Sequence, residues 1–105
     1  MRILYVGSEP RDIHIRHIDG SLKAMQEIVG GYIEPAAPAQ VRAQGLEMLV
    51  NADGIMSGLP CNSNLFPFFF VGNAFFVRVN KDEFVSLTDE DIEFLSLWMD
   101  KLVEG

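Results

Sequence analysis

The sequence has 105 residues, of which 49% are hydrophobic and 22% are charged, and its formal net charge is −7. This length suits one domain, so residues 1–105 are expected to form a single domain, and the composition excludes a wholly disordered chain. An acidic chain has too few Lys and Arg side chains to neutralise phosphates. Direct binding of nucleic acid or of an anionic membrane is therefore not expected.

Purely apolar runs such as Phe68–Val71 are far too short to span a bilayer, and the first residues lack the apolar core of a signal peptide. A cytoplasmic location is expected. Cys61 is the single cysteine, so the chain has neither an internal disulfide nor a cysteine-based zinc site.

The N-terminal third predicts a β-hairpin followed by a helix. Residues 2–6 read as a buried strand, residues 7–12 as a turn, and residues 12–18 as a second strand in which apolar and polar residues alternate. Ser21 is a good N-cap for the helix, and Gly30 with its neighbouring glycine ends it.

The middle of the chain predicts short strands separated by turns. Residues 32–34 form a short strand, and the proline-rich residues 35–38 are a loop or a sheet edge. Residues 46–51 and 54–56 flank an Asp-Gly pair and predict a second hairpin. Residues 58–64 are rich in turn formers and predict an irregular segment.

Residues 66–79 are the most apolar stretch, with six of the eight phenylalanines. Their aromatic and β-branched content favours strands, either one long strand with a bulge at residues 72–73 or two strands joined there by a turn. In one continuous strand both faces are apolar, so either helices cover both faces or a second subunit covers one. We favour a homodimer.

The last helix begins at Thr88, where Thr88 and Asp91 predict a capping box with Asp in the place of the usual Glu or Gln. Its apolar face is wider than a single packing stripe, which also favours a homodimer. The predicted fold class is α+β, a mostly antiparallel sheet with an N-terminal hairpin and two helices in the order β-β-α-β-β-β-β-α.

The sequence contains no recognisable catalytic motif, phosphate loop or dinucleotide-binding fingerprint, and no enzyme activity or cofactor is expected. His14 and His17 fall on opposite faces of a strand, so a shared metal is not expected.

Two groups of residues are candidates for binding. The polar loop offers amide side chains for a ligand, although these could equally cap turn backbone: Pro60, Asn62, Asn64 and Asn73. The start of the last helix offers acids and apolar residues for a protein partner, although its acids could equally complement the helix dipole: Asp89, Glu90, Asp91, Phe94 and Leu97.

Four segments, 21–34, 51–62, 72–75 and 86–92, resemble elements of a family of small phage, plasmid and conjugative-element proteins and follow the same order. The matching elements are the helix followed by Gly-Gly-Tyr-Ile-Glu, the Asp-Gly turn followed by Gly-Leu-Pro-x-Asn, Gly-Asn-Ala-Phe, and Ser-Leu-Thr-Asp-Glu-Asp-Ile. The family is catalogued as a domain of unknown function, so the resemblance implies a genetic context and carries over no catalytic residue.

The function expected from these observations is that of a non-enzymatic accessory protein of a phage or mobile element, which acts by binding a host protein. Two alternatives stay open. One is a protein that binds or sequesters a small molecule such as a nucleotide, and the other is an enzyme of unrecognised type.

Overall fold

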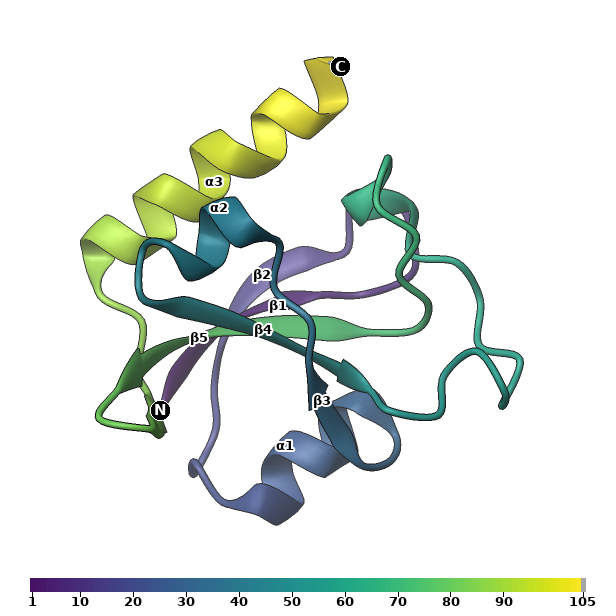
Figure 1. The fold of residues 1–105 in the computed structure, drawn as a ribbon, viewed down its shortest axis with the longest axis horizontal. Coiled ribbons are helices and arrows are strands. Elements are labelled where there is room, and N and C mark those ends of the chain that lie inside the picture. Colours follow the sequence, from purple (N-terminus) through teal and green to yellow (C-terminus); the bar gives the residue numbers. More distant parts are fainter. Residues whose placement is uncertain (105) are drawn as a thin grey trace.

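The computed structural model describes residues 1–104, which form a six-stranded antiparallel sheet and three α-helices (Figure 1). The strand order is β2-β1-β5-β4-β3, and β6 pairs with the far end of β5. The predicted α+β class with an antiparallel sheet is confirmed. The strands are β1 (Arg2–Val6), β2 (Ile13–His17), β3 (Ile33–Pro35), β4 (Leu46–Asn51), β5 (Ala74–Asn80) and β6 (Glu83–Val85), and the helices are α1 (Leu22–Val29), α2 (Ala39–Arg42) and α3 (Asp89–Glu104).

The N-terminal hairpin and α1 form as predicted. β1 pairs with β2 in an antiparallel register that places Tyr5 opposite His14. The Ser21 hydroxyl accepts a hydrogen bond from the N–H of Ala24, 3.0 Å away, which caps the start of α1. Gly30 adopts φ 79°, and its N–H donates to the carbonyl of Gln26, which closes the helix.

The structure adds one helix that the sequence did not predict. α2 is a single turn that begins after Pro38, and a four-residue helix is too short to show a hydrophobic period. Its Val41 side chain is fully buried, so tertiary packing holds the turn in place. The neighbouring β3 is an edge strand that ends in Pro35. Proline has no N–H to donate to a second neighbouring strand, so it suits an edge position.

The predicted second hairpin is wrong. Residues 52–58 form consecutive turns instead of a strand. The Asn51 side chain accepts from the N–H of Asp53, and the N–H of Ser57 donates to the Asp53 carbonyl, so local bonds satisfy this backbone.

The long strand predicted from residue 66 is also wrong in its start, because β5 begins at Ala74. Pro67 interrupts the apolar stretch, and residues 66–73 are irregular apart from the isolated bridge at Val71.

Both faces of the sheet are covered by helices of the same chain. Phe75 and Val77 pack with α1 on one face, and Ala74 and Phe76 pack with α2 and α3 on the other. Figure 1 shows α1 separated from α2 and α3 by the sheet. The apolar character of both faces of β5 therefore needs no second subunit. In the described part of the chain, no helix combines the length and the apolar character that crossing a membrane requires.

Candidate binding groove

Residues 52–73 connect β4 to β5 and form one wall of the candidate site. Within this connection, Cys61 and Val71 make an isolated antiparallel bridge, and residues 63–65 form one 3-10 turn. Leu65 is fully buried in the core under α3 and anchors the 3-10 turn. Asparagine side chains hold this long connection: Asn62 bonds to backbone within it, and both Asn62 and Asn64 tie it to β1 and the turn that follows.

Asn62 holds the connection to β1. Its side chain is fully buried, and its amide nitrogen donates to the carbonyls of Val6 at 3.1 Å and Gly72 at 2.9 Å. Its amide oxygen accepts from the N–H of Asn64 at 3.1 Å. Both polar atoms of this predicted ligand-binding residue are therefore used inside the chain.

Asn64 holds the turn between β1 and β2. Its amide nitrogen donates to the carbonyls of Gly7 at 2.8 Å and Glu9 at 2.7 Å, and its oxygen accepts from the N–H of Arg11 at 2.8 Å. Arg11 has φ 64°, which is rare for a residue with a side chain, and the Asn64 contacts stabilise that turn. Asn64 thus contacts the hairpin turn with all its hydrogen-bonding atoms.

Asn73 and Pro60 lie elsewhere. The Asn73 oxygen accepts from the N–H of Ser8 at 3.1 Å. Asn73 and Pro60 both line a small hollow of about 250 Å³ beside the end of α1. Asn62 and Asn64 do not line this hollow. The four predicted ligand-binding residues therefore do not converge on one cavity, and their role as ligand contacts stays a prediction.

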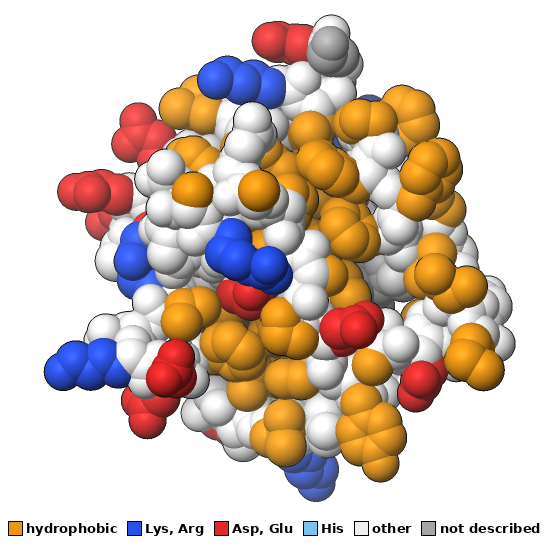
Figure 2. Space-filling view, in the orientation of Figure 1, with side chains coloured by type: hydrophobic (Ala, Val, Ile, Leu, Met, Phe, Trp, Pro, Cys, Tyr) orange, Lys and Arg blue, Asp and Glu red, His pale blue; other side chains and the backbone are white. Residues whose placement is uncertain are grey.

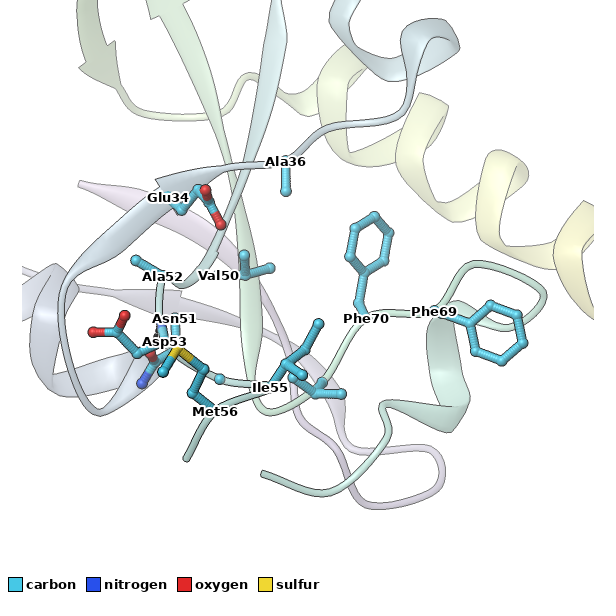
Figure 3. A pocket seen from close by; sticks show the side chains of 12 residues that line it. Glu34, Ala36, Val50, Asn51, Ala52, Asp53, Ile55, Met56, Phe69 and Phe70 are labelled. Atoms are coloured by element: carbon cyan, nitrogen blue, oxygen red, sulfur yellow. Dashed lines mark hydrogen bonds between the residues drawn. The ribbon is translucent and has the colours of Figure 1, made fainter. Parts of the chain in front are cut away.

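A larger groove opens between the end of β4 and the connection (Figure 3). Its volume is about 430 Å³, and its lining is mostly apolar: Glu34, Ala36, Val50, Asn51, Ala52, Asp53, Gly54, Ile55, Met56, Phe69, Phe70 and Val71. Val50 belongs to the buried core, and the partly buried Phe70 packs against that core, so both side chains are held in place in the groove wall. Figure 2 shows hydrophobic side chains gathered along the hollowed middle and one side of this face.

Three large apolar side chains at the groove are left in solvent. Ile55 is 80% exposed, Met56 91% and Phe69 84%. In Figure 3 the Phe69 ring points away from the Phe70 ring. Exposed apolar side chains beside an apolar wall make this groove a candidate docking surface.

The charge of this groove is negative. Glu34 on β3 and Asp53 in the turn after β4 are both exposed at its border, and no Lys, Arg or His lines it. Asn51, the other polar side chain in the lining, is occupied, since its amide nitrogen donates to the carbonyl of Val29 at 3.0 Å. The groove thus offers apolar surface and carboxylates to a ligand.

The predicted partner-binding residues of α3 divide into two places. Phe94 and Leu97 line a hollow of about 480 Å³ between α2 and α3, where Leu97 is 57% exposed. Glu90 is exposed at the start of the helix, and Asp89 pairs with the Arg2 guanidinium at 2.9 Å. Their role in binding a partner stays a prediction.

Asp91 faces inward and has a structural task. Its carboxylate accepts two hydrogen bonds from the Arg78 guanidinium, at 2.8 and 2.6 Å, and a third from the N–H of Thr88 at 2.9 Å. The Thr88 hydroxyl accepts from the N–H of Asp91, which confirms the predicted capping box. The hydrogen bonds from Arg78 hold the pKa of Asp91 below its usual value, against the opposing effect of burial.

The two histidines lie on the exposed edge strand β2. The Nε2 atom of His14 accepts from Arg16 at 2.9 Å, and its Nδ1 lies 3.3 Å from Asp12. Among residues 1–104, no cluster of three or more His, Cys, Asp or Glu side chains has a spacing suited to a metal ion.

Sequence reasoning missed the groove because it assigned residues 54–56 and 66–71 to strands. A signal was present: Ile55 and Met56 are adjacent large apolar residues between glycines, in a segment rich in turn formers. Connections between strands run over the surface, so two adjacent large apolar residues in a turn-rich segment indicate exposed apolar surface.

One comparison with known proteins agrees with the resemblance as far as membership of a domain of unknown function. The sequence model of one family, described as a domain of unknown function (DUF3846), matches residues 1–102. Neither the curated proteins nor the solved structures contain a match to this chain. The match covers nearly the whole chain, so the protein belongs to the family described as domain of unknown function DUF3846.

Proposed function

We propose that this protein is a non-enzymatic interaction module that binds an apolar segment of another protein in the groove between β4 and residues 52–71. In the genetic setting that the sequence resemblance implies, it would be an accessory protein of a phage or mobile element, and the bound segment would belong to a host protein. The exposed rim of Ile55, Met56 and Phe69 carries this proposal.

The rim supports a protein partner because of its chemistry. An exposed phenylalanine and two exposed aliphatic side chains lose contact with water when a partner segment covers them, which favours association. Met56 is unbranched and adapts its shape to different apolar side chains. The apolar wall behind the rim is already packed, so binding needs little rearrangement there.

The charge at the groove indicates what else the segment contains. Glu34 and Asp53 would pair with Lys or Arg side chains next to the apolar anchors, and the formal net charge of −7 would attract a basic segment from a distance. A nucleotide is supported less well than a protein segment, because the lining has no cationic side chain to meet a phosphate.

A library of displayed random peptides, selected on the immobilised full chain, tests the proposal. Selected peptides should combine aromatic or aliphatic residues with Lys or Arg. Replacement of both Ile55 and Phe69 by Ser should raise the Kd of a selected peptide at least tenfold, about 1.4 kcal/mol, because it removes two apolar anchors.

The matched control is Leu97→Ser, which removes an exposed apolar residue from the α2–α3 hollow and should leave the Kd unchanged. Titration with ATP serves as the nucleotide probe. Peptides whose binding depends on Leu97 rather than on Phe69, or binding of ATP without binding of any peptide, would contradict the proposal.

A further inference from the structure

β2 is an edge strand, and within residues 1–104 the N–H of Ile13 is the outward group that has a partner, the Arg11 carbonyl at 2.9 Å. At the ends of the hairpin, Gly7 donates to the Asp12 carbonyl and Ile18 donates to the Met1 carbonyl. Hydrogen-bonded pairs alternate along an antiparallel ladder, so residues 12, 14, 16 and 18 bond to residues 1–7. The N–H and C=O of Ile15 and the C=O of Ile13 therefore point to the open edge.

The other edge of the sheet is closed to pairing. β3 has only three residues, and the last of them, Pro35, has no N–H to donate. Such a short edge that ends in proline is a common protection against strand addition. The open edge at β2, with five residues, has no proline and no bulge.

An exposed apolar surface lies next to the open edge. Ile13 and Ile15 sit opposite Val6 and Leu4, so they point to the face that carries α3. They are 39% and 44% exposed. Beside them is a hollow of about 430 Å³, whose lining includes apolar residues of the connection and of the end of α3: Phe66, Met99, Leu102 and Val103.

We infer that β2 pairs antiparallel with β2 of a second copy of this chain, so that two sheets join into one across a two-fold axis. The free groups are self-complementary: the N–H of Ile15 in each copy donates to the C=O of Ile13 in the other. Because β3 cannot pair in the same way, the assembly closes as a dimer and does not grow into a fibre.

The charges on β2 select the register. With His14 of the two copies face to face, Ile13 lies opposite the partner's Ile15, and Asp12 lies opposite the partner's Arg16. Among residues 1–104, Asp12 has no Lys or Arg partner, and its side chain is 40% exposed. Arg16 lies over the Tyr5 ring, 3.8 Å from its centroid, on the same face as Asp12 and His14.

The symmetry also brings the apolar flanks together. An axis perpendicular to the joined sheet leaves α3 of both copies on the same face. Phe66, 63% exposed, and Val103, 87% exposed, then lie beside the isoleucine pairs and lose contact with water. The register thus joins apolar to apolar on one face and acid to base on the other.

Disulfide trapping tests the register. In a Cys61→Ser background, His14→Cys places two thiols at a non-hydrogen-bonded antiparallel pair, where the Cα separation of about 4.5 Å allows a disulfide. This variant should become a covalent dimer in a glutathione buffer. The control His17→Cys faces residue 11, where the chain leaves the strand with φ 64°, and should stay monomeric on a non-reducing gel. Trapping at position 17 instead of 14, or at neither, overturns the register.

Light scattering and a charge exchange test the dimer itself. Wild type should have twice the 11.7 kDa mass of one chain. Asp12→Arg and Arg16→Asp should each raise the dimer Kd at least tenfold, and the double variant should recover the wild-type value within threefold, with circular dichroism used to verify folding. A monomeric wild type, or a double variant no better than the single ones, overturns the inference. Replacement of Ile55 and Phe69 by Ser leaves β2 intact and should leave the mass of the dimer unchanged. Peptide binding in the groove and dimerisation through β2 are therefore tested independently.

Discussion

Asn62→Ala gives the sharpest test of how residues 52–73 are held. Asn62 is fully buried and makes three side-chain hydrogen bonds, two to carbonyls and one to a backbone N–H. A buried hydrogen bond contributes about 1 kcal/mol, and its loss leaves a partner unsatisfied. The variant should therefore lose about 3 kcal/mol of unfolding free energy. This is a large share of the roughly 5–15 kcal/mol of a small domain.

The matched control is Asn64→Ala. Asn64 also makes three side-chain hydrogen bonds, but two of them are exposed, so water can replace the lost partner. We expect it to lose about 1 kcal/mol. Urea unfolding followed by circular dichroism measures the unfolding free energy of both variants. Unchanged m-values would show that unfolding exposes the same surface area in each variant as in the wild type. Equal losses for the two variants, or a loss below about 1 kcal/mol for Asn62→Ala, would refute the argument that burial makes Asn62 the main anchor.

Three further predictions concern stability. Because Asp91 has a lowered pKa in the folded state, its pairing with Arg78 stabilises the fold above about pH 4, and this stabilisation is lost as the pH falls through the folded pKa. Asp91→Asn should therefore reduce the fall in unfolding free energy at acid pH, and an unchanged fall would argue against the ion pair. Gly58 and Gly72 both have positive φ, but an added Cβ meets nothing within 4 Å at Gly58 and a side-chain carbon at 2.7 Å at Gly72. In thermal melts, Gly58→Ala should lower the unfolding free energy by about 1 kcal/mol and Gly72→Ala by clearly more. The reverse order would mean that crowding at Gly72 is unimportant. Ser21→Ala should cost about 1 kcal/mol through loss of the α1 cap, and a smaller effect than that of Ser96→Ala on the exposed side of α3 would contradict this.

Local signals in the sequence predicted the elements that carry them. Ser21 and Gly30 bound α1, and the Thr88–Asp91 box starts α3, because caps involve residues within a few positions of one another. The alternation after the first turn predicted β2 for the same reason. These elements fix the α+β class and the hairpin.

The candidate site was harder to predict because its contacts span long separations in sequence. Asn62 bonds to Val6, and Asn64 to Gly7, more than fifty positions away, and no local pattern reveals such partners. Strand propensity in the phenylalanine-rich stretch was overridden by Pro67 and by the isolated bridge of Val71 with Cys61. The burial of Asp91 likewise depends on Arg78 from a different element.

The asparagine anchors couple the central connection to the N-terminal hairpin. Residues 52–73 keep their final shape only while β1 and the following turn supply the carbonyls that Asn62 and Asn64 bind. The N-terminal hairpin and the central connection should therefore open and close as one cooperative unit, with amide protons in both exchanging at a common rate. Any event that detaches β1 from the sheet would therefore also disrupt the groove that residues 52–71 form.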